Sequence, residues 1–158
     1  MIPKKYIIIA PHADDEIIGC WTLFDSGLVD TVIFGEDVLT TEVEASKNFF
    51  GYNALWIQSY QFDYSTDKIY LFPDPVYELH PYHRALGHRG EELLRAGKEV
   101  VFYTTNMLTP YIFEVPRAEN KHYALNTLYP QKSKLWKYEH KYFLFEGYNK
   151  WIFKWPDL

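Results

Sequence analysis

The sequence is poor in cysteine, has no excess of basic residues and contains no long hydrophobic run. Cys20 is the one cysteine among 158 residues, so an internal disulfide is excluded and a reducing, cytoplasmic environment is expected. Lys and Arg number 16 against 21 Asp and Glu, a formal net charge of −5, which disfavours a nucleic-acid partner bound through its phosphates. No stretch reaches the length of a transmembrane helix. We therefore expect one globular domain, residues 1–158, that buries its own core.

Short apolar runs alternate with segments of helical periodicity along most of the chain. The runs predict strands at residues 6–10, 31–34, 54–57 and 100–104, and a short one at 111–115. The periodic segments predict helices at residues 17–24, 40–50, 83–96, 117–129 and 132–145. This alternation is typical of an α/β fold, in which a mostly parallel sheet carries helices on both faces.

Two further segments have no such periodicity. Gln58–Val76 is rich in Tyr, Asp and Pro and is predicted to be an irregular loop that lies over the functional site. Trp151–Trp155 is strongly aromatic, and its composition leaves an edge strand and a partner contact equally open, with contact at a membrane interface a distant third.

Ionisable residues gather directly after the first predicted strand. His12 and three consecutive acidic residues, Asp14, Asp15 and Glu16, follow the apolar run Tyr6–Ala10, and open α/β sheets bind ligands at the carboxyl ends of their strands. Such a group of ionisable side chains costs solvation free energy unless a cation, a substrate or water occupies the site. His12 and Asp15, three residues apart at a helix entry, can reach one point, whereas Asp14 points elsewhere. The pattern predicts a metal site.

A second cluster, His80 and His83, has the same spacing at another predicted helix start. Either histidine would complete a His/Asp/His ligand set with an open fourth position, which is typical of a catalytic zinc site. Other divalent metals also bind such nitrogen and oxygen ligands. The remaining histidines are expected on helical segments away from the metal: His88, His122 and His140.

Two motifs resemble those of a known family. Pro11–Gly19, with the sequence Pro-His-Ala-Asp-Asp-Glu-Ile-Ile-Gly, resembles the His-Pro-Asp-Asp-Glu-x-x-Gly signature of the PIG-L/LmbE-like family. His80–His83, with the sequence His-Pro-Tyr-His, resembles the family's second motif, His-Pro-Asp-His. Weaker similarity extends through the second predicted helix and the segment from Lys121 to Gln131. These proteins are zinc-dependent deacetylases of molecules that contain N-acetylglucosamine, and their domain is Rossmann-like.

The resemblance implies a role for each matching residue. It implies a zinc ion held by three ligands: His12, Asp15 and His83. Asp14 would be the general base that acts on a zinc-bound water, and His80 the general acid or the charge that stabilises the oxyanion. Asp63 stands where the family places a carboxylate that binds sugar hydroxyl groups. The implied substrate is an N-acetylated amino sugar.

The chain also departs from the family pattern. Ala13 replaces a proline, and Tyr82 replaces the aspartate of the second motif, so Glu78 or Asp74 is expected to supply a carboxylate behind the ligands. The second predicted helix begins with Thr41–Glu42 where an arginine is expected. The short loops suggest an open site for a sugar on a larger carrier, or one completed by a second subunit of a homo-oligomer. Two alternatives stay open: an amidase for another sugar–acyl conjugate, and an inactive member that binds a sugar or a partner.

Overall fold

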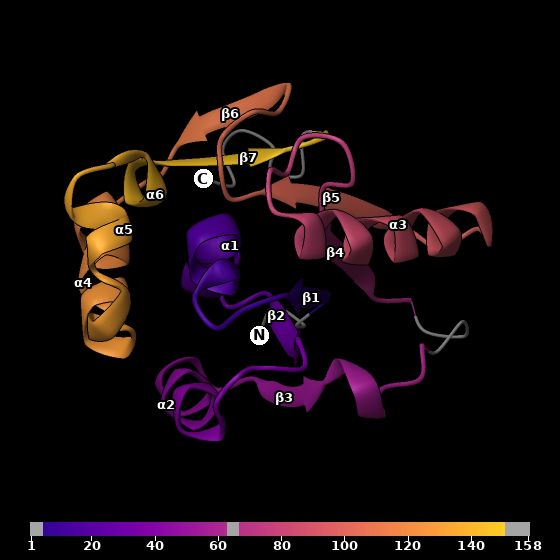
Figure 1. Ribbon diagram of the computed structural model, residues 1–158, viewed down its shortest axis with the longest axis horizontal. Helices are drawn as coiled ribbons and strands as arrows, with labels where there is room; N and C mark the ends of the chain where they lie inside the picture. Colours follow the sequence, from indigo (N-terminus) through magenta and orange to yellow (C-terminus); the bar gives the residue numbers. More distant parts are fainter. Residues whose placement is uncertain (1–4, 63–66, 151–158) are drawn as a thin grey trace.

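A computed structural model of the chain describes residues 5–62 and 67–150 (Figure 1). Its strands form one seven-stranded sheet in the order β3-β2-β1-β4-β5-β7-β6. The strands are β1 Tyr6–Ala10, β2 Val29–Phe34, β3 Asn53–Trp56, β4 Ile69–Pro73, β5 Val100–Thr104, β6 Tyr111–Glu114 and β7 Phe145–Tyr148. The α-helices are α1 Asp15–Asp25, α2 Thr40–Phe50, α3 Pro81–Arg95, α4 Ala118–Leu128, α5 Lys134–Lys137 and α6 Lys141–Leu144. Two 3₁₀ turns complete the described elements, η1 Ile57–Ser59 and η2 Pro130–Lys132.

Helices cover both faces of the sheet, as the sequence predicts. β1 to β5 pair in parallel, whereas β7 is antiparallel to both β5 and β6. Tyr6 and Ile8 of β1 pack toward α1 and α4, while Ile7 and Ile9 pack toward α3, as expected where side chains alternate along a strand buried on both faces. Figure 1 shows α1, α2 and α4 on one side of the sheet and α3 on the other. The α/β, mostly parallel, Rossmann-like fold is confirmed.

The predicted irregular segment contains a central strand. Ile69–Pro73 forms β4, which lies between β1 and β5 in the sheet, so the prediction of a loop over all of Gln58–Val76 is wrong. Four residues of β4 are buried, because both of its faces are covered. The Tyr, Asp and Pro residues around this short apolar run obscure it in the sequence. Pro73 is tolerated because it lies beyond the residues of β4 that pair with β1, so its missing N–H removes no hydrogen bond between these strands.

The predicted helix over 132–145 is also wrong. This segment forms the short pieces α5 and α6, followed by strand β7, whose sequence Phe-Glu-Gly-Tyr contains two residues that disfavour strands. Glu146 is fully buried in β7, and it accepts a hydrogen bond from Lys121 Nζ at 3.0 Å. Lys121, also fully buried, donates to the Ile18 carbonyl oxygen at 2.7 Å. The positive charge of Lys121, which comes from α4, therefore allows β7 to bury the carboxylate of Glu146.

The Lys121–Glu146 pair gives a stability prediction. We expect Lys121→Met to lower the free energy of unfolding by about 3–5 kcal/mol, because the substitution leaves a buried carboxylate without its cation. Urea unfolding followed by circular dichroism measures the loss. Lys141→Met is the matched control, since Lys141 forms an exposed pair with Glu139 at 3.1 Å and such pairs contribute about 1 kcal/mol or less. Equal losses in the two variants would contradict the prediction.

The strand order reverses between β1 and β4. From β1 the chain continues to β2 and β3 in one direction, and β4 and β5 lie in the other. The loops after β1 and β4 therefore diverge and leave a crevice at the carboxyl ends of these two strands, which is where doubly wound sheets bind ligands. The Trp151–Trp155 segment lies outside the described residues. None of the described helices is both long and apolar enough to cross a bilayer.

Candidate metal centre

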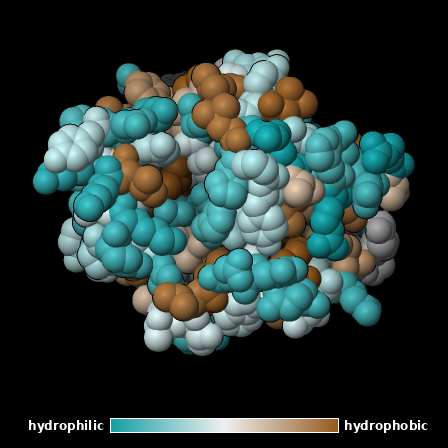
Figure 2. Space-filling model, viewed as in Figure 1, coloured by the Kyte–Doolittle hydropathy of each residue, from teal (hydrophilic) through white to brown (hydrophobic). Residues whose placement is uncertain are grey.

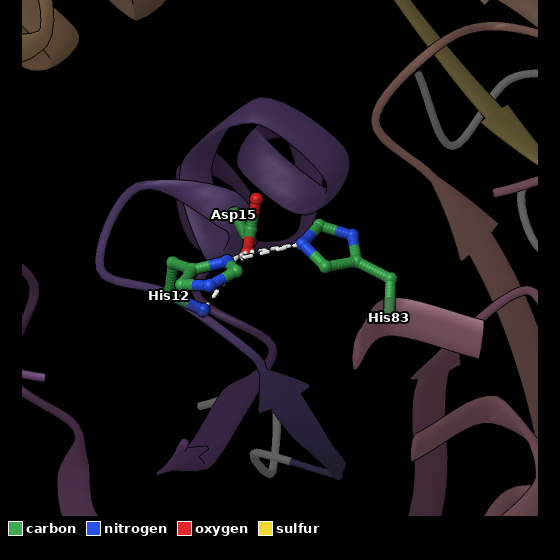
Figure 3. A group of neighbouring side chains, drawn as sticks. All are labelled: His12, Asp15 and His83. Carbon is green, nitrogen blue, oxygen red and sulfur yellow. Dashed lines mark hydrogen bonds and ion pairs between the residues drawn. The ribbon is translucent and has the colours of Figure 1, made fainter. Parts of the chain in front are cut away.

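Three of the predicted metal ligands meet in the crevice between β1 and β4 (Figure 3). His12 Nδ1 lies 3.2 Å from Asp15 Oδ2 and 3.1 Å from His83 Nε2. His83 Nε2 lies 3.1 Å from Asp15 Oδ2, so the three atoms form a nearly equilateral triangle. Residues from distant parts of the sequence thus present their ligand atoms to one point, and this group can hold a metal ion.

The backbone around His12 and Asp15 fixes both side chains. The His12 backbone N–H donates to Asp15 Oδ2 at 2.8 Å, so the carboxylate is already oriented by the turn that precedes α1. Asp14, the N-cap residue of α1, has φ 130°, a conformation that side-chain-bearing residues rarely adopt. The chain tolerates this strain at the residue between the two ligands, where it separates the Asp14 side chain from theirs.

The start of α3 positions His83. Pro81 occupies the first turn, and the N-cap residue His80 accepts the Tyr82 backbone N–H at Nδ1, 3.1 Å away. Proline and a side-chain cap are typical of a well-defined helix start. His83 faces the crevice from the first turn of this helix, and it is 4% exposed.

Asp15 and His83 stabilise each other's charged forms. Burial alone would raise the pKa of Asp15, but the charge of His83 and hydrogen bonds from His12 and His83 outweigh burial and lower it. Burial likewise opposes protonation of His83, yet Asp15 and Glu78 raise its pKa to about 10. A bound cation would take the place of the proton that His83 holds in the metal-free chain. The site is therefore built to hold positive charge.

Glu78 supplies the carboxylate behind His83 that the sequence led us to expect from Glu78 or Asp74. Glu78 Oε1 lies 3.3 Å from His83 Nδ1, the ring nitrogen opposite the ligand atom. The backbone N–H of Thr105 donates to the same oxygen at 2.8 Å, and the Thr105 hydroxyl contacts both carboxylate oxygens. Asp74 instead accepts the backbone N–H groups of the turn at Val76 and Tyr77. Glu78 thus faces the imidazole as an ion-pair partner, in the place that such carboxylates take behind a metal-binding histidine.

Removing the Glu78 charge gives a prediction for metal affinity. We expect Glu78→Gln to weaken binding of a divalent ion about 10–100-fold, because the amide is a poorer partner for the His83 N–H. Calorimetric titration with Zn²⁺ measures the change. Asp74→Asn is the control, since the Asp74 carboxylate caps a neighbouring turn. An unchanged affinity in Glu78→Gln would show that His83 needs no such support.

Asp14, which the family resemblance suggests as the general base, lines the cavity beside the three ligands. Burial, and then the charge of Asp15, raise its pKa well above the usual value, while Lys132 lowers it. The Asp14 backbone N–H donates to Glu16 Oε2 at 3.0 Å. Glu16 is fully buried and accepts further hydrogen bonds from Ser46 and Tyr129. This buried network holds the strained backbone of Asp14 in place.

Lys132 is a site residue that the sequence motifs do not reveal. Its Nζ lies 4.0 Å from Asp14 Oδ2 and 3.5 Å from Glu42 Oε2, and it donates to the Ala13 carbonyl oxygen. Glu42 stands near the start of α2, where the family pattern led us to expect an arginine. The cation at this side of the site therefore comes from η2. No local pattern signals it, since Lys132 lies in a segment predicted to be an ordinary helix.

His80 joins the histidine cluster from the rim. Its ring centroid lies 5.0 Å from those of His12 and His83, so the three imidazoles converge, but its Nδ1 is used in capping α3. Desolvation, and then the charges of His83 and His12, lower the pKa of His80. This shift favours the neutral imidazole of His80, whereas the role implied by the family resemblance uses its charge.

The other sequence-predicted residues lie apart from the cluster or outside the described residues. Asp63 falls outside the part of the chain that the structure describes. His88 pairs with Glu91 at 2.8 Å on the exposed face of α3, away from the cluster as expected. His122 and His140 both contact the Phe143 ring, far along the chain from the motifs.

A cavity of about 610 Å³ opens above the cluster. Its walls come from the loop after β4, from the residues after β5 and from the segment η2–α6. A volume of roughly 300–1,000 Å³ is typical of sites for small molecules. The cluster is thus reachable by a ligand of substantial size.

Comparison with known proteins shows the fold but no family. No protein-family model and no curated protein matches the chain. The crystal structure of the conserved protein TT1542 from Thermus thermophilus is similar, with a TM-score of 0.64 over 97% of this chain and 98% of that chain. The two sequences are 12% identical, so the similarity concerns the arrangement of the elements.

Proposed function

We propose that the protein is a zinc-dependent hydrolase that removes the N-acetyl group from an N-acetylglucosamine-containing substrate or another N-acetylated amino sugar. The observation that carries the proposal is the triangle of His12, Asp15 and His83 with a further carboxylate, Asp14, beside it in an open cavity. Acetamide hydrolysis is the reaction of the family that the two motifs resemble.

The spacing of the ligand atoms supports zinc. Zinc bonds of about 2.0–2.1 Å at tetrahedral angles place ligand atoms about 3.3–3.4 Å apart. The three separations are 3.1, 3.1 and 3.2 Å, close to the spacing that zinc requires. Two imidazoles and one carboxylate, beside a cavity, are the donor types of a catalytic zinc site.

The chain's own residues divide the remaining tasks. Zinc, when bound, supplies Lewis-acid polarisation of the amide carbonyl and lowers the pKa of water. Asp14 accepts the proton of the attacking water, and its ionised form is favoured by Lys132 and by positive charge at the adjacent ligands. Because the buried Glu16 network fixes the Asp14 backbone, the base does not need to reorient during the reaction.

His80 lies at the rim of the cluster, and its Nε2 is the ring nitrogen not used in capping α3. A neutral imidazole can donate this N–H to the carbonyl oxygen of the amide, and the hydrogen bond strengthens as negative charge develops on that oxygen. The leaving amine takes the proton that Asp14 accepted from the attacking water, so the proton count of the reaction balances.

Acetate release from the zinc-loaded protein tests the proposal. Methyl glycosides of N-acetylglucosamine and N-acetylgalactosamine are incubated with the full chain, and acetate and free amine are quantified together. Equimolar release that disappears after chelation and returns with Zn²⁺ supports the proposal. Metal binding without hydrolysis of any N-acetylated sugar would contradict it and would favour the binding-protein alternative. Faster release of a longer acyl group would favour the amidase alternative.

A further inference from the structure

Hydrophobic side chains are exposed at the mouth of the catalytic cavity. Leu79, in the loop after β4, and Leu135, on α5, both line the cavity, and they are 68% and 46% exposed. Ile18 and Tyr142 also line the cavity and add apolar surface to it. Figure 2, which has the same viewpoint as Figure 1, shows hydrophobic side chains scattered over a mostly hydrophilic face. Single exposed leucines are ordinary, but two from distant elements at one catalytic cavity indicate a site for an apolar group.

The backbone beneath both leucines is anchored. Leu79 follows the buried Glu78, and its carbonyl oxygen accepts a hydrogen bond from Arg84 Nη1 at 2.7 Å. Leu135 precedes Trp136, which is 1% exposed and donates from Nε1 to Asn126 Oδ1 at 2.7 Å. Because the neighbours are fixed in the core, the leucines are held toward the cavity instead of folding into the interior. A ligand that covers them loses little free energy in ordering the site.

We propose that the substrate carries an apolar aglycone, and that Leu79 and Leu135 bind it. This inference rests on the proposed deacetylase function. The scissile acetamide must reach the cluster at the cavity floor, where Asp15 and His83 are 5% and 4% exposed. The acetyl group is short, so the part of the substrate that extends to the rim is attached on the amine side of the scissile bond. An apolar substituent there removes the exposed leucine surface from water.

Matched glycosides test this inference. Zinc-loaded full chain is assayed for acetate release with the methyl and hexyl β-glycosides of N-acetylglucosamine. We expect a KM for the hexyl glycoside roughly tenfold lower or more, with a similar kcat, because contacts far from the scissile bond strengthen binding of ground state and transition state alike. Leu79→Ser and Leu135→Ser should bring the hexyl-to-methyl ratio of kcat/KM toward one. Leu94→Ser is the control, since Leu94 is 48% exposed on α3 and does not line the cavity.

Several outcomes would overturn the inference. A hexyl-to-methyl ratio of kcat/KM near one in the parent shows that the leucines bind no aglycone. A high ratio that both Leu79→Ser and Leu135→Ser retain shows the same. Faster hydrolysis of an N-hexanoyl than of an N-acetyl methyl glycoside places the apolar group on the acyl side instead.

The assay also separates this inference from the proposed function. If the methyl glycoside is hydrolysed and the hexyl glycoside has no higher kcat/KM, only the inference that the leucines bind an apolar aglycone is overturned. If neither glycoside releases acetate, the proposed function fails, and calorimetry on zinc-loaded Asp14→Asn protein decides the subsite. Tighter binding of the hexyl glycoside, lost in the additional Leu135→Ser variant, supports the subsite, whereas equal or undetectable binding overturns it.

Discussion

His83→Ala is expected to weaken zinc binding by more than about 100-fold and to abolish hydrolysis with it. Loss of a residue that merely supports a ligand weakens metal binding about 10–100-fold, and His83 contributes a ligand atom itself. The substitution removes one corner of the triangle and leaves Asp15 and His12, 3.2 Å apart, to hold the ion. Calorimetric titration of chelator-stripped protein with Zn²⁺ measures the loss directly, independent of any substrate.

His88→Ala is the matched control for this experiment. His88 lies on the same helix, but it pairs with Glu91 on the exposed face, so the variant should bind zinc as tightly as the parent. Zinc binding that survives in His83→Ala would show that the ion is held elsewhere. In that case His80 would be the first candidate for a replacement ligand, because its ring centroid lies 5.0 Å from that of His83. Zinc titration of the double variant His80→Ala/His83→Ala would test it.

Asp14→Asn should lower kcat by about 10²–10⁴-fold while zinc stays bound. General-base catalysis contributes a factor of this size, and the amide of asparagine keeps the shape of the side chain but cannot accept the proton. Rates of acetate release and zinc content measured on the same samples separate loss of the base from loss of the metal.

Asp25→Asn serves as the control for Asp14→Asn. Asp25 ends the same helix and pairs with Arg117 at the surface, so its amide variant should hydrolyse substrate at the parent rate. If Asp14→Asn keeps the parent kcat, another group accepts the proton. Glu16 would not be an obvious substitute, because it is fully buried and its oxygens already accept several hydrogen bonds.

The features that local sequence determines were predicted well. The apolar run of β1 has the predicted boundaries, Tyr6–Ala10, because continuous burial on both faces requires continuous apolar residues. The close approach of His12 and Asp15 follows from their spacing on one turn. The helix predicted at residues 40–50 has the observed bounds of α2 and ends at Gly51 in the left-handed conformation, whereas α3 begins at Pro81, two residues before the predicted start. In each case a few neighbouring residues contain the whole signal.

The features that depend on distant contacts could not be predicted in this way. β7 exists as a strand with a buried Glu146 because Lys121 reaches it from α4, and nothing near Glu146 in the sequence indicates this partner. Lys132 reaches Asp14 from a distant part of the chain for a similar reason: the turn η2 folds back over the start of α1. β4 was missed because its burial comes from β1 and β5, which flank it in space.

The separation of His12, Asp15 and His83 along the chain determines when during synthesis a metal site could form at this cluster. His12 and His83 are 71 positions apart, and they meet only after β4 has paired with β1 and α3 has formed. A growing chain that has not yet passed His83 offers the ion just a histidine and a carboxylate. Tight metal binding at this cluster would thus be a late step of biosynthesis, and a bound ion would link two parts of the sheet that are synthesised at different times.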